Sequence, residues 1–124
     1  MDKGLGKRLF EFAVSVIKYS RILPKSKEYD IIKYQLIKSA TSSGANYEEA
    51  QGGISKPDFT NKINISLKEM RESNYWLRII KEISDANNEL NLLLEESEEL
   101  KNILGSIYSK LSKPKWNQFE IRNL

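Results

Sequence analysis

Four side chains suited to binding an anion recur at helical spacing in the middle of the chain. Lys68, Arg71, Tyr75 and Arg78 are separated by three or four residues, which places them on one face of an α-helix. Lys and Arg contact phosphates, and a Tyr ring can stack on an unpaired base. The spacing predicts a nucleic-acid-binding face. The alternative is an ordinary solvated face paired with nearby glutamates.

A second group of cations lies on the first predicted helix and just after it. The residues alone do not decide which of the two groups would face a ligand. The net charge is only +3, but residues 85–100 contain six acids and no Lys or Arg, which leaves the rest of the chain at +9. This imbalance indicates an anionic partner for the basic part. The second group comprises Lys7, Lys18, Arg21, Lys25 and Lys27.

The absence of Cys and His excludes most catalytic chemistry. None of the 124 residues is a Cys or a His, so thiol nucleophiles, Cys/His zinc sites, His general bases and the Glu-x-x-His ligands of di-iron bundles are all excluded. The glutamate run 95–99 could bind a divalent cation, but such a run is more typical of a solvated helix face. We predict a protein that is not an enzyme and uses no metal or cofactor.

The N-terminus does not have the pattern of a signal peptide. Glu11 interrupts the apolar stretch from Leu9 to Ile17, and no run approaches the ~20 apolar residues needed to span a bilayer. A chain without Cys is compatible with a reducing compartment. We predict a soluble, cytoplasmic protein with no membrane partner.

Proline, glycine and capping residues divide the chain into four helical segments. Pro24 ends the first, Gly52-Gly53 ends the second, and Pro57 lies in the first turn of the third. Short connections make neighbouring helices antiparallel. The sequence predicts an all-α, up-down-up-down four-helix bundle over 1–111, followed by a tail at 112–124 in which Trp116 and Phe119 either belong to a disordered end or dock onto a bundle. The predicted helices span residues 6–23, 27–51, 56–83 and 89–111.

Each predicted helix carries an apolar stripe for the core. In the second helix the middle of the stripe consists of small residues, so another helix can approach closely there. The stripe of the first is Leu9, Ala13, Val16, Ile17 and Ser20; that of the second is Tyr29, Ile32, Leu36, Ser39, Ala40, Ser43, Tyr47 and Ala50; that of the third is Phe59, Ile63, Leu67, Met70 and Leu77; and that of the fourth is Leu90, Leu93, Leu100, Leu104, Ile107, Tyr108 and Leu111.

The third helix carries a second apolar stripe, nearly opposite the first. Ile65, Trp76, Ile79 and Ile83 have nothing left to bury against inside a small domain. An exposed stripe containing Trp would be a solubility liability. We therefore predict that these four residues form a contact between subunits. The alternative is that the tail of the same chain covers them.

The second and third helices resemble a known family. The match covers residues 9–111, and its specificity comes from the order and spacing of residues along two helices. The matching residues are Leu23-Pro24, Glu28, Tyr29, Gln35-Leu36, Ser39-Ala40, Ser43 through Ala50, Phe59, Ser66-Leu67, Glu69, Glu72 and Tyr75-Trp76-Leu77. The chain resembles the four-helix-bundle proteins encoded within intervening sequences of bacterial 23S ribosomal RNA genes, a family that includes the accessory variability determinant of diversity-generating retroelements.

This resemblance implies a homo-oligomer, typically a pentameric ring, with basic surfaces and nucleic-acid or ribonucleoprotein partners. A reverse transcriptase would be the partner in the retroelement-like case. Asn46 and Glu49 keep two positions of the family pattern, whereas Ala50 replaces its Gly. The pair forms either a recognition site or a buried hydrogen-bond network that fixes helix or subunit register.

Two non-enzymatic functions remain open from the sequence; an enzyme would need carboxylate, Lys or Tyr chemistry, and no set of such residues converges in the sequence. One is a non-enzymatic, homo-oligomeric protein that binds structured RNA or a ribonucleoprotein through basic surfaces. The other is a protein-interaction scaffold without direct nucleic-acid contact, which the modest net charge of +3 keeps open.

Overall fold

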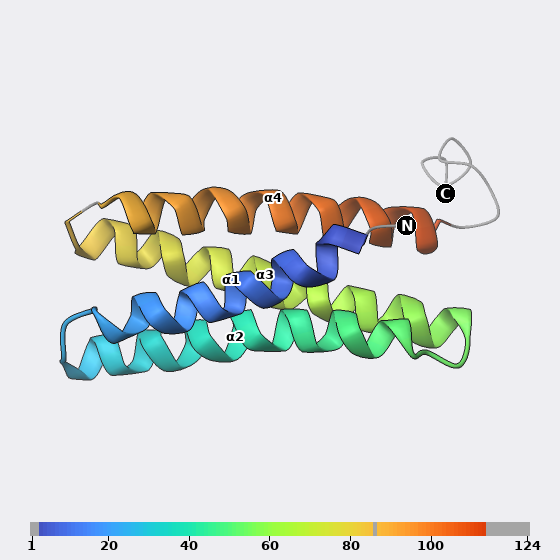
Figure 1. The fold of residues 1–124 in the computed structure, drawn as a ribbon, viewed down its shortest axis with the longest axis horizontal. Helices are drawn as coiled ribbons and strands as arrows, with labels where there is room; N and C mark the ends of the chain where they lie inside the picture. The colour runs from blue at the N-terminus through green and yellow to red at the C-terminus, as the bar shows by residue number, and fades with distance from the viewer. Residues whose placement is uncertain (1–2, 86, 114–124) are drawn as a thin grey trace, which may run out of the picture.

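The computed structural model describes residues 3–85 and 87–113. Within these ranges the chain forms four helices and no strand, which confirms the predicted all-α class with four helices (Figure 1). Residues 114–124, with Trp116 and Phe119, lie outside the described residues. The helices are α1 (Lys3–Arg21), α2 (Lys27–Gln51), α3 (Lys56–Ile83) and α4 (Asn88–Leu111).

Side-chain caps fix the starts of three helices. The hydroxyl of Ser26 accepts a hydrogen bond from the backbone N–H of Tyr29 at 3.1 Å, and Ser55 caps α3 in the same way. The side chain of Asn87 accepts from the backbone N–H of Leu90 at 2.8 Å. These caps satisfy amides that the first turn leaves without a helical partner. For this reason the predicted starts of these helices are correct to within one residue.

The ends of α1 differ from the prediction. The helix begins three residues early, because Leu5 is fully buried and its burial outweighs the low helix propensity of the neighbouring glycines. It stops at Arg21 rather than Leu23, since the backbone N–H groups of Ile22 and Leu23 bond to carbonyls three residues back. The last turn is therefore tightened and leads into Pro24.

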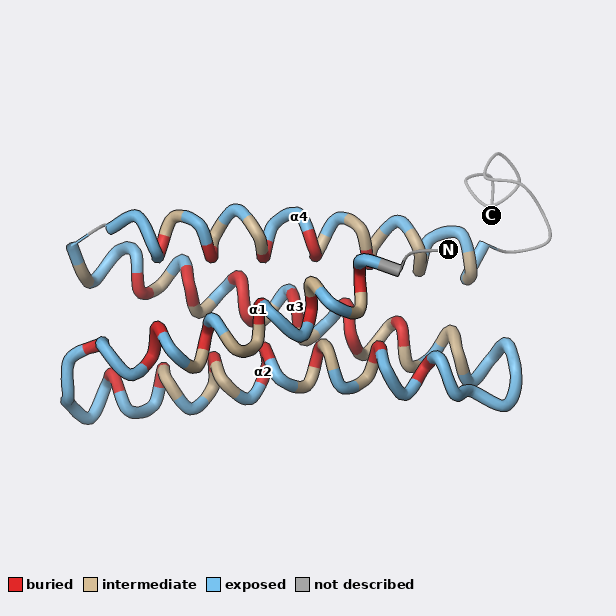
Figure 2. The backbone as a smooth tube through the Cα atoms, in the orientation of Figure 1, coloured by how far each residue is buried: buried red, intermediate tan, exposed pale blue. Residues whose placement is uncertain are grey.

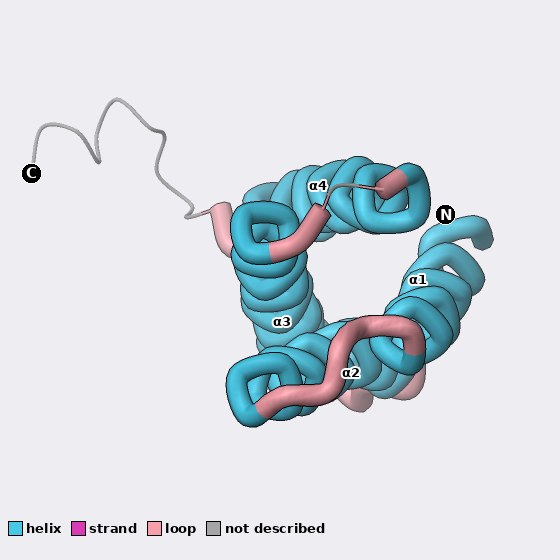
Figure 3. The backbone as a smooth tube through the Cα atoms, turned by 90° about the vertical axis from the view of Figure 1, so that its left-hand side faces the viewer, coloured by secondary structure: helices cyan, strands magenta, loops and turns pink. Residues whose placement is uncertain are grey.

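The four helices surround one core in a square arrangement. Each helix packs against two neighbours, in the order α1–α2–α3–α4 and back to α1 (Figure 3). The diagonal pairs, α1 with α3 and α2 with α4, make no backbone contact within the described residues. In Figure 1 the chain reverses its direction at each connection. None of the described helices is both long and apolar enough to cross a bilayer.

The buried residues lie along the inner sides of all four helices (Figure 2). Every residue predicted for the inner stripe of α2 is buried. Three residues of the predicted α1 stripe, Leu9, Val16 and Ser20, are buried. The other two, Ala13 and Ile17, are half-buried at the edge, because Phe12 and Tyr19 fill the core instead. Two neighbouring apolar stripes occur on α1, and spacing alone does not identify the inner one.

Serine side chains line the seam between α2 and α3, which make the most extensive of the helix contacts. The hydroxyls of Ser39 and Ser73 lie 2.8 Å apart, and the hydroxyl of Ser43 donates to the carbonyl of Ser66 at 2.8 Å. All four are buried. Small side chains bring the helices close, as the sequence predicts, and the hydrogen bonds satisfy polar groups inside the core.

A candidate nucleic-acid interface on α3

The predicted basic stripe of α3 lies at the surface. Lys68, Arg71 and Arg78 are exposed, and 47% of Tyr75 is accessible to solvent. Lys68 and Arg71 make no ion pair within the described parts of the chain. The ion pairs with Glu72 and Glu82 that the alternative of a solvated face requires are not formed among the described residues; Glu72 instead accepts a hydrogen bond from the indole N–H of Trp76 at 3.1 Å. The stripe therefore presents Lys68 and Arg71 beside an accessible ring.

Two neighbours hold the ring of Tyr75. The indole of Trp76 meets it edge to face, with ring centroids 5.1 Å apart and planes at 79°. The guanidinium carbon of Arg78 lies 5.7 Å from the Tyr75 centroid, within the range of a cation–π contact. An aromatic ring fixed beside a guanidinium is the kind of surface on which unpaired bases stack.

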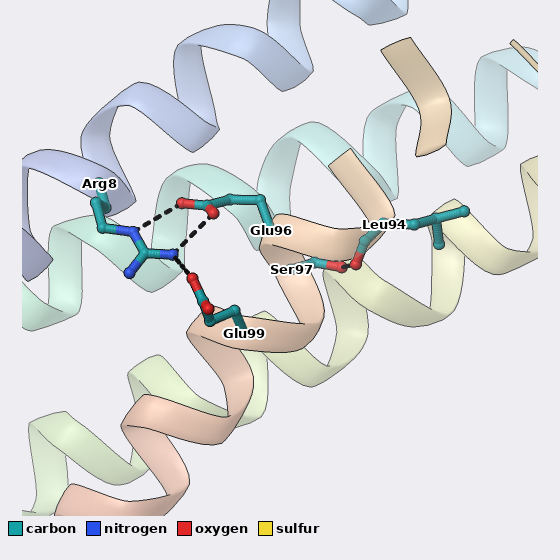
Figure 4. Close-up of polar contacts among 5 residues, drawn as sticks. All are labelled: Arg8, Leu94, Glu96, Ser97 and Glu99. Carbon is teal, nitrogen blue, oxygen red and sulfur yellow. Dashed lines mark hydrogen bonds and ion pairs between the residues drawn. The ribbon is translucent and has the colours of Figure 1, made fainter. Parts of the chain in front are cut away.

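A hydrogen-bonded chain from the core positions Arg78. Its Nε donates to Oδ1 of Asn74 at 3.0 Å, and Nδ2 of Asn74 donates to the hydroxyl of Ser97 on α4 at 2.9 Å. That hydroxyl donates in turn to the carbonyl of Leu94 at 2.9 Å (Figure 4). Asn74 and Ser97 are buried. Sequence reasoning missed both; the available signal was an Asn four residues before Arg78 on the core-facing side of a helix.

An acidic groove borders the stripe on the side of α4. Arg78 and Asn74 line it together with Glu95, Glu98 and Glu99. The field of these carboxylates disfavours phosphate there. The part of the stripe best suited to an anion is therefore its outer side, around Arg71 and Tyr75.

Basic residues engage three of the four glutamates between 95 and 99. Nε and Nη2 of Arg8 donate to the two carboxylate oxygens of Glu96 at 3.0 and 2.8 Å, and Nη2 also donates to Glu99 (Figure 4). These hydrogen bonds raise the pKa of Arg8. Glu98 pairs with Lys101 at 3.0 Å. We refer to Arg8, Glu96 and Glu99 as the Arg8 clasp. In residues 3–85 and 87–113, no group of three or more acids is placed to hold a metal ion.

The second group of cations divides into two parts. Lys18 and Arg21 at the end of α1, with Lys25 and Lys27 after it, are exposed at one end of the bundle. Lys7 lies further back on α1, 4.0 Å from Glu11. Basic residues at the C-terminal end of α1 also complement its helix dipole, so this end has a structural reason to be basic.

Asn46 and Glu49 do not contact each other through a hydrogen bond in the described structure. The side-chain N–H of Asn46 bonds to the carbonyl and hydroxyl of Ser42, one turn back, at 2.9 and 3.1 Å. Glu49 is exposed and accepts from Nζ of Lys62 on α3 at 2.9 Å. That hydrogen bond raises the pKa of Lys62. Glu49 therefore links α2 to α3, whereas Asn46 bonds within its own helix.

The second apolar stripe of α3 is partly packed. Ile65, Trp76 and Ile79 are half-buried, and 46% of Ile83 is exposed. Trp76 and Ile79 pack against the core, so the expectation that the stripe has nothing to bury against within the chain is wrong for these two. Trp76 and Ile79 are thus partly packed against the core and partly accessible to solvent.

A family model for the 23S rRNA-intervening sequence protein matches residues 5–106. The chain belongs to this family. The resemblance to proteins of 23S rRNA intervening sequences is thereby confirmed, and the match includes the whole of α3. No curated protein matches the chain.

The solved structure of another bacterial protein has a similar fold. It is a protein of unknown function from the S23 ribosomal protein family of Bacteroides thetaiotaomicron, 31% identical to this chain. The superposition has a TM-score of 0.76 and covers 84% of this chain and 97% of the other. The fold of this chain is thus shared over nearly the whole of that relative.

Proposed function

We propose that this chain is a non-enzymatic, homo-oligomeric protein that binds structured RNA or a ribonucleoprotein through α3. The observation that carries the proposal is the ring of Tyr75, held by Trp76 and Arg78 beside the exposed Arg71, with Lys68 at the border of the same face. Cations bind the phosphates and the ring stacks on an unpaired base. Lys18 and Arg21 provide a second, smaller basic surface.

The family gives the proposal its wider setting. An intervening sequence of 23S ribosomal RNA is part of the family name, so a structured RNA or a ribonucleoprotein is the natural class of partner. By the family resemblance we also propose a pentameric ring. A location in the cytoplasm is proposed because the chain contains no Cys. In a ring each basic residue recurs in every subunit, and the fields add. A chain of the retroelement type would leave chemistry to a reverse transcriptase.

The proposal is tested by titrating a fluorescently labelled RNA stem-loop with the protein and following anisotropy over a series of salt concentrations. Binding through phosphates makes log affinity fall linearly with log salt. We expect the variant R71Q/R78Q to bind more weakly and with a slope smaller by about 1 to 2, since each lost phosphate contact removes roughly 0.7 to 0.9.

The matched control is K110Q/K113Q, which removes the same charge at the end of α4. Both lysines are exposed and form no ion pair among the described residues. We expect this variant to keep nearly the wild-type slope. Equal losses in the two double variants would show that only net charge matters, and the α3 site would be rejected. No binding of the wild type at low salt would favour a protein-interaction scaffold instead.

A further inference from the structure

An apolar groove runs along the outer side of α1 and α2. It has a volume of about 320 Å³ and is lined by Phe10, Ala13, Val14 and Ile17 of α1 and by Ala45 and Glu48 of α2, among others. The side chain of Phe10 is 62% exposed. The second apolar stripe of α1 lines this groove. It includes Ala13 and Ile17, which helical spacing predicts on the inner face. Within the described chain nothing covers it.

Close approach of the two helices shapes the groove. A Cβ atom added at Gly44 would lie 3.5 Å from both the Cβ and the carbonyl oxygen of Leu9, so the backbones of α1 and α2 nearly touch there. Small side chains at Ala13 and Ala45 leave a shallow floor between Phe10 and the rim of α2. Helical segments bind in apolar grooves of this kind through anchors spaced three, four and seven residues apart.

The outer edge of α3 supplies such anchors. Trp76, Ile79 and Ile83 follow one another at intervals of three and four residues, and Ile65 extends the line toward the start of the helix. We call these four residues the α3 ridge. The groove is formed by α1 and α2 and the ridge by α3, and α1 and α3 make no backbone contact within the described residues. One copy cannot bring its own two surfaces together.

We propose that the groove between α1 and α2 of one copy receives the α3 ridge of the next copy. This inference rests on the proposed homo-oligomer and specifies its contact. Pairing two different surfaces gives a heterologous contact, which closes into a ring when the rotation permits. A two-fold dimer would instead require each surface to pair with itself.

Charged residues beside the two surfaces support the α3 ridge of a second copy as the occupant, and they indicate the direction of α3 relative to α1. Glu48 lies at the Gly6 end of the groove, and Arg21 lies fifteen residues further along α1, about 22 Å at 1.5 Å per residue. Lys68 and Glu82 flank the ridge fourteen residues apart, about 21 Å. With α3 parallel to α1, Lys68 meets Glu48 and Glu82 meets Arg21.

These four charges are available for the contact. All are exposed, and none forms an ion pair within the described parts of a single copy. In this arrangement Lys68 and Arg21 are used in the contact between copies, so the RNA-binding surface proposed above narrows to Arg71, Tyr75 and Arg78, with Lys18 left of the second surface. The opposite direction would place Lys68 against Arg21 and Glu82 against Glu48, and both pairs would repel.

A mixing experiment tests the heterologous contact by mass, with no RNA present. F10E disables the groove and I83E disables the ridge, and both positions are exposed enough for the fold to persist. We expect each variant to be a monomer of 14.4 kDa. An equimolar mixture should give a species of twice that mass, because one intact groove then meets one intact ridge. L92E, at an exposed apolar position on α4, is the control and should keep the wild-type mass.

A charge swap tests the direction. E48K should shift the wild-type oligomer toward monomer, and adding K68E to the same chain should restore it. If the two changes weaken assembly additively, the parallel arrangement is overturned.

The remaining outcomes separate this inference from the proposed function. A wild type that stays monomeric at every concentration overturns both the oligomer and the groove contact. An oligomer that survives F10E and I83E overturns only the groove contact. Folded monomeric variants that do not combine on mixing show an isologous contact and also overturn it.

Discussion

Replacing Asn74 with Ala tests the idea that the core of the bundle positions the RNA-binding face. The substitution removes the hydrogen bond from Nδ2 to Ser97 at 2.9 Å and the acceptor of Arg78 at 3.0 Å. A neutral internal hydrogen bond contributes about 1 kcal/mol net, and one to a charged group somewhat more. Since Arg78 is exposed, its share is discounted for solvent screening. We expect a loss of about 2 kcal/mol of unfolding free energy.

Chemical and thermal denaturation measure that loss. For a chain of 124 residues, 1 kcal/mol corresponds to roughly 4 °C, so the melting temperature should fall by about 8 °C. The hydroxyl of Ser97 still donates to the carbonyl of Leu94, which keeps the loss below that of an orphaned buried group. The matched control is N102A, an exposed Asn beside the same groove, which should change stability by less than about 0.5 kcal/mol.

RNA affinity, measured well below both melting temperatures, provides the second readout. Without Asn74, Arg78 is no longer fixed beside the ring of Tyr75, so binding should weaken severalfold in N74A and remain unchanged in N102A. A fully stable N74A protein would show that the hydrogen-bonded chain is not formed. A destabilised variant with undiminished RNA affinity would refute the link from core to binding face.

Three further substitutions test separate parts of the bundle. Burial and the charge of Glu72 raise the pKa of Glu69, so ionisation of Glu69 opposes folding. We expect E69Q to have a higher melting temperature than the wild type at neutral pH. This difference in melting temperature should shrink as the pH falls through the raised pKa, because the folded wild type then binds the proton. R8M removes the Arg8 clasp at a partly exposed site and should cost about 1 kcal/mol, with amide exchange of α1 increasing most. G44A should stabilise the chain by roughly 0.5–1 kcal/mol in urea unfolding, because its Cβ would meet Leu9 at an ordinary contact distance of 3.5 Å.

Helical spacing predicts the inward-facing residues of a helix correctly where that helix has one dominant apolar face. The stripe of α2 is an example: all eight of its predicted residues are buried. On α1 two apolar faces lie side by side, so spacing predicts Ala13 and Ile17 as core residues, whereas Phe12 and Tyr19 occupy the core. Only contact with the neighbouring helices distinguishes the two.

The candidate site was predictable at its surface but not beneath it. Cations and an aromatic ring at intervals of three and four residues indicate the exposed face of α3 directly. Asn74 and Ser97 bond across two helices that are distant in sequence. No periodicity in a single segment predicts such a pair, because both are polar residues at buried positions.

The Arg8 clasp has a consequence for the order in which the molecule forms. The bundle has four contacts between helices within the described residues. Three of them join consecutive helices across short connections, so they can form while the chain is still emerging during synthesis. The fourth, between α1 and α4, joins residues 88 positions apart at Arg8 and Glu96. Closing it costs the most chain entropy. Until α4 is complete, α1 has one neighbouring helix instead of two. We therefore expect the hydrogen bonds from Arg8 to Glu96 and Glu99 to form last in folding.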